Sequence, residues 1–468
     1  MDYRNSDKLT FRAKIGYSAA SIGDAIAYML ITTFIMFYLT TVAGIRPAAA
    51  GALAAIGTIW DAVVNPIIGY LSDHAGTGWG RRRPFMIGAC FPLLASMVLV
   101  FSSFNISYPV KIIYYGIVII AFWTSFTAFF VPYYALGAEY TRDYGERTTL
   151  RSYASFLNMV GTIFSMVLPT LMVSLFEGWG LSTQKAWQIT AFLLGAISVV
   201  SIIITAFAAK DIDVCESEEE RRCKKQRTGA ADMFREYVQV LSLKPMRILL
   251  MVSLFYLLGY AILISDFVYV LTYNLGFNGK EVSLGMFGRS GIIIIFIPLV
   301  LKLCEKTDKR RALMYVLAGG IAGLLVLRFL PFGSVAVTAV FIMVTAITTQ
   351  TYWQIVPAIF YDVCEYDEYK TGRRREGAIL SVQGLVEAMA SGLGTQMLGF
   401  ILQFAGFDGT SAVQSRITLD WILNCTTWFP AIFLIAAAIA IYKFPITKEV
   451  YERIAEELKE RKRLNGTD

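Results

Sequence analysis

Apolar segments close to the length of a membrane-crossing helix recur from one end of this 468-residue chain to the other. A helix needs about 20 apolar residues to cross the hydrocarbon of a bilayer, so this recurrence limits the fold more than any other feature does. Only 16% of the residues are charged and 56% are hydrophobic, whereas a soluble domain carries about a quarter charged residues. The sequence therefore predicts an all-α polytopic membrane protein and argues against a soluble multidomain protein.

Twelve segments qualify as membrane spans, and the longest polar interruption of the chain separates six of them from the other six. We expect the spans at residues 15–43, 47–73, 84–103, 110–140, 151–177, 186–209, 247–276, 281–303, 311–331, 335–365, 377–405 and 418–443. The predicted domains are an N-terminal six-helix bundle, a cytoplasmic linker, a C-terminal six-helix bundle and a cytoplasmic tail, at residues 1–209, 210–246, 247–443 and 444–468. In the tail, Val450, Ile454 and Leu458 form one stripe of a helix that we expect to be solvated, with a specific partner site as the alternative.

Basic residues indicate the orientation. Clusters of Lys and Arg occur at both termini and in alternate loops, whereas the other loops hold single residues at Arg46, Lys111, Lys185, Lys280 and Arg416. Basic loops stay on the cytoplasmic side, so both termini are predicted to be cytoplasmic, in a plasma or inner membrane. The net charge of +7 is then a signal of topology, and no nucleic-acid partner is implied. The six cysteines lie in spans or in the linker, so no disulfide framework is implied.

Six charged residues fall inside predicted spans, namely Asp24, Asp61, Asp266, Arg289, Arg328 and Glu387. A charge at the centre of a membrane helix costs roughly 2.5–3.5 kcal/mol on insertion scales and usually faces the bundle interior or a water-filled cavity. We therefore expect these residues to line a cavity or to pair with one another. For Arg289 and Arg328, near span ends, extension of the side chain to the membrane surface is the alternative.

A polar face follows the second span. Asp61, Asn65, Gly69 and Asp73 are four residues apart and share one side of the helix. The span then ends in a cluster of three arginines, Arg81–Arg83. We predict that Asp73 with Arg81 and Arg82 forms a charge latch at the cytoplasmic mouth, although a basic loop that sets topology would have the same composition.

These motifs resemble those of a known family. The stretch "GYLSDHAGTGWGRRRP" is similar to the loop between the second and third helices of major facilitators. "WDAVVNPIIGYLSD", "GERTTLRSYASF" and "YDVCEYDEYKTGRRREGAILSVQG" resemble the glycoside–pentoside–hexuronide:cation symporters, a melibiose permease-like family. The resemblance covers nearly the full chain. It implies two pseudo-symmetric six-helix bundles, with a substrate site between repeated halves, and the import of a sugar, glycoside or uronide by alternating access.

The resemblance also implies roles for residues. Asp24 matches a first-helix acid that binds sugar hydroxyls, and Arg151, Trp353 and Gln383 match other substrate-site positions. Tyr28, one helical turn from Asp24, is added from spacing alone. Asp61 and Thr127 match the coupling-cation site, with Asn65 beside Asp61, and Thr127 is also counted with the substrate-binding residues. Asp362 and Glu365 match acids of the cytoplasmic gate, for which the plausible partners are Arg147 and Arg373–Arg375.

Departures from the family pattern bear on the coupling ion. Asn65 stands where the family usually has an acid, and Val64, Phe130 and Ala388 replace polar or charged residues. A sodium site needs several oxygen ligands with negative charge nearby, whereas a proton needs one titratable carboxylate. The sequence thus favours proton symport through Asp61, with uncoupled diffusion and sodium symport as alternatives, and implies no cofactor.

Two other functions remain open. The more apolar cavity would also suit an aryl glycoside or a lysolipid-like amphipathic solute. A membrane-embedded enzyme would require a metal site in the acidic run at Asp362, Glu365, Asp367 and Glu368, but basic residues flank this run and His74 is the only histidine. No catalytic or metal-binding residue is therefore predicted, and we expect a monomer that binds a small molecule within the bilayer.

Overall fold

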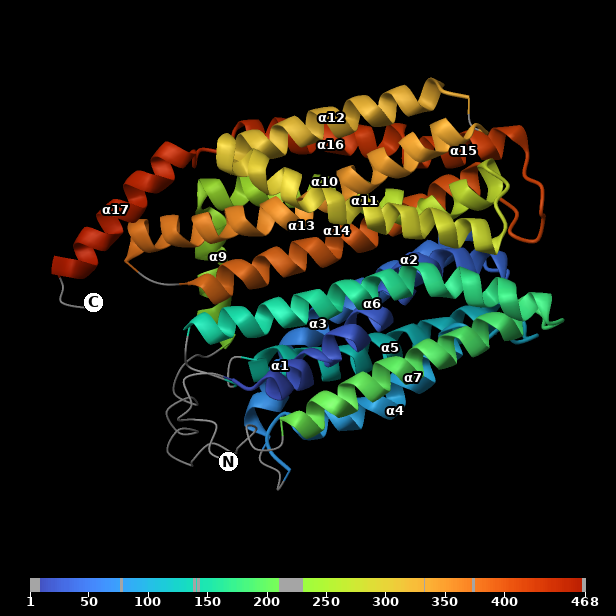
Figure 1. Cartoon of the computed structure of the whole chain (residues 1–468), viewed down its shortest axis with the longest axis horizontal. Helices are drawn as coiled ribbons and strands as arrows, with labels where there is room; N and C mark the ends of the chain where they lie inside the picture. Colours follow the sequence, from blue (N-terminus) through green and yellow to red (C-terminus); the bar gives the residue numbers. More distant parts are fainter. Residues whose placement is uncertain are drawn as a thin grey trace. The chain divides into compact units, whose positions relative to one another are not determined.

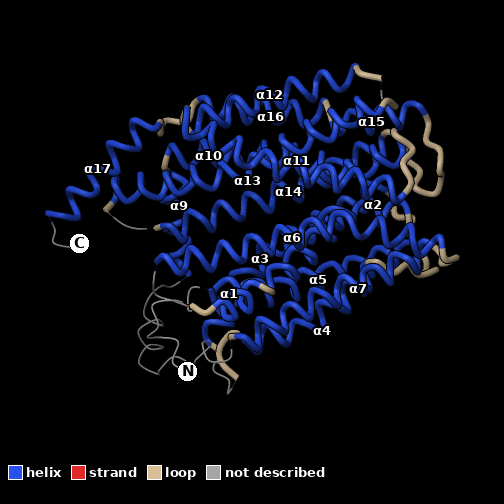
Figure 2. The backbone as a smooth tube through the Cα atoms, viewed as in Figure 1, coloured by secondary structure: helices blue, strands red, loops and turns tan. Residues whose placement is uncertain are grey.

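The computed structural model describes residues 9–75, 79–137, 140, 144–209, 230–331, 333–372 and 375–464. Within these residues the chain forms helices and loops without strands (Figure 2). Twelve helices of the described part are long and apolar enough to cross a membrane. The predicted all-α architecture of twelve membrane spans is confirmed.

The helices follow one another along the chain as labelled in Figure 1. Up to the linker they are α1 (Phe11–Ser18), α2 (Ala20–Thr41), α3 (Pro47–His74), α4 (Arg83–Val100), α5 (Tyr108–Gly137), α6 (Tyr144–Gly178) and α7 (Thr183–Ala208). After it come α9 (Ala230–Ser242), α10 (Lys244–Tyr269), a π-helical turn (Val270–Asn274), α11 (Gly279–Lys306), α12 (Lys309–Phe329), α13 (Val335–Thr371), α14 (Glu376–Phe404), α15 (Arg416–Thr426), α16 (Trp428–Tyr442) and α17 (Lys448–Leu464).

The last span is interrupted, which the hydropathy pattern does not reveal, whereas Ala19 of the first span keeps helical backbone angles of −56° and −41°. Ala19 separates α1 from α2, and Thr427 separates α15 from α16. The hydroxyl of Thr427 donates to the Leu423 carbonyl at 2.6 Å. A side chain that bonds to the backbone one turn earlier competes with the helical ladder and bends the helix. A single polar residue inside an apolar segment therefore breaks the span without shortening it.

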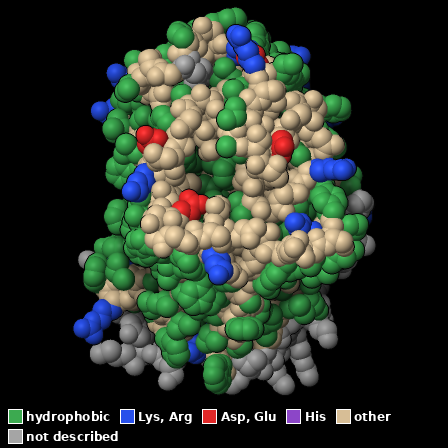
Figure 3. Space-filling view, turned by 90° about the vertical axis from the view of Figure 1, so that its right-hand side faces the viewer, with side chains coloured by type: hydrophobic (Ala, Val, Ile, Leu, Met, Phe, Trp, Pro, Cys, Tyr) green, Lys and Arg blue, Asp and Glu red, His purple; other side chains and the backbone are tan. Residues whose placement is uncertain are grey.

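The chain forms two compact units, which we call the first and the second unit. The first unit contains Met1–Gln226 together with Leu271–Phe287 and Thr395–Thr418, and the second contains Arg227–Val270, Gly288–Gly394 and Leu419–Asp468. Short stretches from the second half of the sequence thus belong to the first unit. In that unit the connections between α4 and α5 and between α6 and α7 lie at the right of Figure 1, and Figure 3 views this end, where Lys and Arg side chains stand apart from one another.

Close packing at glycines explains why the end of α14 belongs to the first unit. A Cβ atom added to Gly399 of α14 would lie 2.5 Å from the Pro47 carbonyl oxygen and 3.1 Å from the Gly51 Cα atom of α3. The side chain of Gln396 donates to the Ala48 carbonyl at 3.2 Å. The missing side chains let the two backbones touch, as small residues do in other membrane-helix pairs.

The C-terminal tail is not solvated on all sides. Ile454 and Leu458 of α17 are buried, and α17 packs against α13. The Lys309 ammonium lies 5.4 Å from the centre of the Tyr451 ring. The predicted apolar stripe is therefore covered by this chain itself, which corrects the expectation of a solvated helix.

We predict that Gly399→Leu destabilises the first unit. The added side chain cannot fit against Pro47 and Gly51, so α3 and the end of α14 must separate. The melting temperature in detergent should fall by several degrees. Gly377→Leu is the matched control, because it lies on the same helix with no heavy atom within 4 Å of its added Cβ and gains helix propensity of about 1 kcal/mol. Equal melting temperatures of the two variants would contradict the packing role of Gly399.

Candidate functional site

Most of the charged residues predicted inside the spans have a polar partner within their own unit. The contacts join Asp24 to Asn158, Asp61 to Thr127, Arg289 to Thr349, Arg328 to Asn424 and Asp420, and Glu387 to Tyr352 and Gln383. Arg289 is only 2% exposed, so its side chain does not extend to the membrane surface. Partners inside the protein offset the cost of placing these charges in the bilayer.

Asp24 lies on α2 within a small polar cluster of the first unit. The Asn158 amide of α6 donates to Asp24 Oδ2 at 3.0 Å. On the same face of α2, the Ser21 and Tyr133 hydroxyls lie 2.6 Å apart. The sequence did not point to Asn158, although it lies seven residues from Arg151 on the same helical face, which is the signal that could have indicated it.

Arg151 belongs to the same neighbourhood but leaves its guanidinium exposed. It lies over the Tyr134 ring, 4.3 Å from the ring centre, and donates to the Tyr17 hydroxyl at 3.5 Å. Aromatic faces attract a cation without neutralising it. Arg151 therefore retains donors for a ligand, beside a carboxylate that retains acceptors.

Asp61 forms a second cluster of the first unit, with partners on α3 and α5. The Thr127 hydroxyl donates to Asp61 Oδ1 at 2.5 Å. Asn65 donates to the backbone carbonyl of Asp61 at 2.8 Å, so its amide is directed along its own helix. Trp123 lies on α5, one helical turn before Thr127. Tyr28 of α2 packs edge-on against Trp123, with ring centres 5.8 Å apart. The two residues matched to the coupling-cation site thus do contact each other.

The second unit contains a polar cluster on α13 and α14. Glu387 Oε1 accepts hydrogen bonds from the Tyr352 hydroxyl and the Gln383 amide, each at 2.7 Å. Trp353 follows Tyr352 in the chain, packs edge-on against it with ring centres 5.2 Å apart, and is 43% exposed. The predicted residues Trp353 and Gln383 are thereby joined to Glu387, whose role the sequence left open.

The structure describes the side chains of some of the predicted gate residues but not of others. Arg81 and Arg82 are buried, at 3% and 7% exposure, and are not part of a solvated loop. Arg83 donates to the Ala206 carbonyl at 2.7 Å, which fixes the start of α4 beside the end of α7. The side chains of Asp73 and Arg147 lie outside the described residues, so the charge latch stays a prediction.

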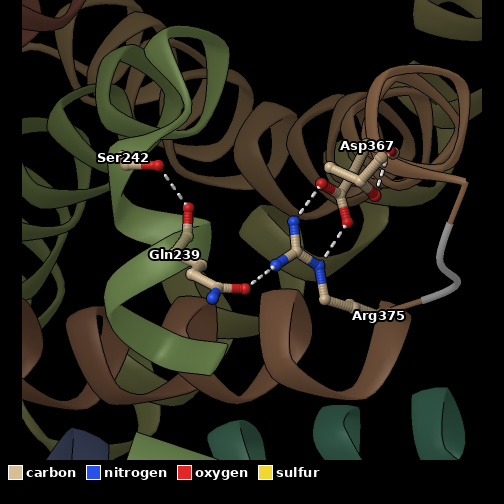
Figure 4. A network of polar contacts seen from close by, with 5 residues as sticks. Gln239, Ser242, Asp367 and Arg375 are labelled. Atoms are coloured by element: carbon tan, nitrogen blue, oxygen red, sulfur yellow. Dashed lines mark hydrogen bonds and ion pairs between the residues drawn. The ribbon is translucent and has the colours of Figure 1, made fainter. Parts of the chain in front are cut away.

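The acids of the gate have partners other than those expected. Asp362 pairs with Lys309 of α12 at 2.6 Å. Arg375 makes two hydrogen bonds to Asp367, of 2.9 and 2.5 Å, and a third to Gln239 of α9 at 2.8 Å (Figure 4). These bonds stabilise the guanidinium and raise the pKa of Arg375. Arg375, expected as a plausible partner of Asp362 and Glu365, pairs with Asp367 instead, because Asp367 lies on the helix face that turns toward the start of α14. Arg373 and Arg374 lie outside the described residues.

Tyr451 of α17 connects Glu365, the second acid of the predicted gate, to the tail. Its hydroxyl interacts with the Glu365 carboxylate, and burial together with this negative charge raises the pKa of Tyr451 to about 12. Tyr451 therefore stays neutral at physiological pH and acts as a hydrogen-bonding group toward Glu365.

Asp266 is the exception among the charged residues of the spans. It is fully buried on α10, and within the described part of the chain neither carboxylate oxygen has a hydrogen-bond partner. In that same part no group of three or more His, Cys, Asp or Glu side chains could hold a metal ion.

Twelve apolar spans that enclose carboxylates, hydroxyls and amides define the class of protein as a polytopic membrane transporter. The chain matches the family described as "MFS/sugar transport protein" over residues 16–448 and belongs to that family. It is therefore a multi-pass secondary transporter of a small molecule and not an enzyme.

Relatives agree with this assignment. The isoprimeverose transporter of Lactiplantibacillus pentosus is 24% identical, over 93% of this chain and 88% of its own length. The glucuronide carrier protein homolog of Escherichia coli (strain K12) is 23% identical over 98% of both chains. The solved structure of a D-xylose-proton symporter has a TM-score of 0.66 at 14% identity, covering 93% of this chain and 98% of that chain. The resemblance to glycoside–pentoside–hexuronide:cation symporters and the major facilitator fold are confirmed.

We predict that Arg375→Gln destabilises the second unit by about 3–5 kcal/mol, because the fully buried Asp367 then has no cation. Denaturant titration of the purified protein in detergent measures this loss. The double variant Asp367→Asn/Arg375→Gln should recover most of it. Glu452→Gln is the control for an exposed ion pair and should change stability by less than about 1 kcal/mol. If the double variant is as unstable as Arg375→Gln, the buried charge is not the cause.

Proposed function

We propose that the protein imports a sugar or a glycoside by alternating access and couples this import to proton symport through Asp61. The observation that carries the proposal is the separation of two carboxylates of the first unit into two sets of partners. Asp24 is held by an amide beside an exposed arginine, and Asp61 by a hydroxyl. One set suits a polyhydroxylated ligand and the other suits a titratable ion site.

The substrate class follows from the Asp24 cluster. A carboxylate accepts hydrogen bonds from two neighbouring hydroxyls of a sugar, and the Arg151 guanidinium can donate to ring or hydroxyl oxygens. Asn158 occupies part of Asp24 Oδ2 and leaves Oδ1 available. The relatives named for isoprimeverose and glucuronide support a sugar or glycoside as the substrate.

The coupling ion follows from the Asp61 cluster. The contacts of Asp61 come from Thr127 and Asn65, which are neutral and add no negative charge. Sodium favours sites with several oxygens and more than one charge, whereas one carboxylate suffices for a proton. The hydroxyl of Thr127 can donate to ionised Asp61 and can accept from the protonated form, so both states keep a partner.

A specific observation also favours a glycoside with an apolar aglycone as a second candidate. Phe126 and Phe130 are stacked with ring centres 5.5 Å apart, and Phe130 lies 4.5 Å from the Tyr134 ring that carries Arg151. This aromatic row suits an aryl group or another amphipathic solute such as a lysolipid. Uncoupled facilitated transport is the alternative to proton symport.

We place the protein in the plasma or inner membrane as a monomer with both termini in the cytoplasm. The single basic residues of the loops at one end of the first unit support this orientation, because cytoplasmic loops carry the basic clusters.

We predict that Asp24→Ala abolishes uptake and that Asn158→Ala raises the KM of uptake about tenfold or more. Asp24→Ala removes the carboxylate that accepts charge-assisted hydrogen bonds, each worth roughly 1.5–3 kcal/mol. Asn158→Ala removes the amide that holds this carboxylate, so the Asp24 side chain is free to rotate. Thr162→Ala is the control on α6, since its hydroxyl donates only to its own helix at Asn158. Uptake of labelled glycosides into cells with matched amounts of membrane-inserted protein measures the effect. Normal uptake by Asp24→Ala would refute this substrate site.

We predict that Asp61→Asn abolishes accumulation but keeps downhill flux and exchange. One charge moving down 100 mV supplies ~2.3 kcal/mol, enough for about fifty-fold accumulation of a neutral solute. Proteoliposomes with an imposed potential and an internal pH dye measure accumulation and proton entry together. Asn65→Asp, which adds a second carboxylate one turn away, should gain stimulation by sodium. Sodium-stimulated uptake by the wild type at constant pH would refute the proton assignment.

A further inference from the structure

Glu387 is one of the charged residues of the second unit for which the sequence predicts no role, and two neighbours fix its geometry. Oε1 accepts from the Tyr352 hydroxyl and from the Gln383 amide, each at 2.7 Å. Tyr352 is fully buried and Gln383 is 8% exposed. The Tyr352 hydroxyl is itself anchored 2.9 Å from the Ser253 hydroxyl of α10. Buried donors therefore hold one oxygen of a half-buried carboxylate in place.

The second oxygen of Glu387 is left available. Among the described residues, both hydrogen bonds to this carboxylate go to Oε1, and no basic side chain pairs with it. A carboxylate oxygen with no partner accepts hydrogen bonds strongly and repels other anions. Glu387 is thus the group of this cluster that can bind a ligand. Gln383 is more buried, and its amide donates to Glu387 Oε1.

An exposed aromatic side chain packs against the tyrosine that donates to this acceptor. Trp353 is exposed over 43% of its surface and packs edge-on against Tyr352 and Tyr260, with ring centres 5.2 and 6.2 Å away. These two contacts fix the indole relative to the residue that holds Glu387. An indole and a carboxylate that share one tyrosine as their neighbour suit a pyranose ring, which has an apolar face of C–H groups and a rim of hydroxyl donors.

We propose that Glu387 contacts the substrate and determines its charge, by accepting hydrogen bonds from a neutral glycosyl ring and disfavouring a ring that carries a carboxylate. Gln383 and Tyr352 are then positioning residues that act through Glu387. This inference rests on the proposed transport of sugars or glycosides and narrows that class to neutral ones.

The test compares pairs of substrates that differ only at C6. Uptake of 4-nitrophenyl glucosides, galactosides and mannosides is measured against the matching 4-nitrophenyl uronides, in proteoliposomes that contain the full chain. The wild type should have a KM at least about tenfold lower for the neutral member of a transported pair. Glu387→Gln keeps the size of the side chain and removes the charge, so the KM for the neutral ring should rise about tenfold or more and the preference over the uronide should narrow.

A double-mutant cycle tests the positioning roles. Tyr352→Phe should raise the KM for the neutral ring severalfold without lowering the maximal rate, and it should have no further effect in a Glu387→Gln background. Gln383→Ala should behave in the same way. Glu305 is an exposed acid of the same unit, so Glu305→Gln is the control. It should leave the KM and the maximal rate of uptake unchanged. Additive effects of Tyr352→Phe and Glu387→Gln would mean that Tyr352 does not act through Glu387.

The outcomes separate this inference from the proposed function. A wild type that transports uronides as well as the neutral glycosides, or an unchanged KM in Glu387→Gln, overturns the role of Glu387 while sugar transport stands. A wild type that transports no member of any pair overturns the proposed function and this inference with it. If Glu387→Gln does not insert into the membrane, the KM changes of Tyr352→Phe and Gln383→Ala decide the question.

Discussion

With the exception of Asp266, the charged residues of the spans follow one constraint on which the structure depends, which is that a polar group inside a bilayer must find its partner within the protein. The carboxylates near the middle of their spans, Asp24, Asp61 and Glu387, are held by amides and hydroxyls. Full ion pairs occur instead near the ends of helices, as in Lys309–Asp362 and Arg375–Asp367. A neutral partner orients a carboxylate and leaves its charge available to a proton or a ligand, whereas an ion pair consumes that charge. The distribution of partner types therefore separates the carboxylates that we propose bind a substrate or a proton from those that form ion pairs.

Much of the fold was predictable because membrane spans depend on local composition. The twelve spans, the all-α class and the family follow from hydropathy and short motifs. The break at Thr427 was not predictable, since it depends on the backbone conformation of one residue inside an apolar segment. The cover over the stripe of Ile454 and Leu458 was missed for a related reason, because amphipathicity shows that a face will be covered but not by what.

The candidate site was predictable residue by residue but not contact by contact. Sequence motifs pointed to Asp24, Asp61, Thr127, Trp353 and Gln383, and the structure adds the Asp61–Thr127 bond as a direct contact. Asn158 and Tyr352 were missed because their importance comes from contacts with Asp24 and Glu387, which the sequence position alone does not show. Arg375 was expected as a plausible partner of Asp362 and Glu365, but it pairs with Asp367. The three acids lie within six residues, and only the rotation of α13 decides which one faces Arg375.

The position of α17 has a consequence for the order in which the protein is assembled. The Lys309–Asp362 pair joins helices that are both synthesised before the tail, but the Tyr451 ring that lies against Lys309 belongs to the last helix of the described chain. During translation, α12 and α13 are made before α17. The end of the second unit that carries Asp362 and Glu365 therefore acquires its final neighbours only after α17 has been synthesised.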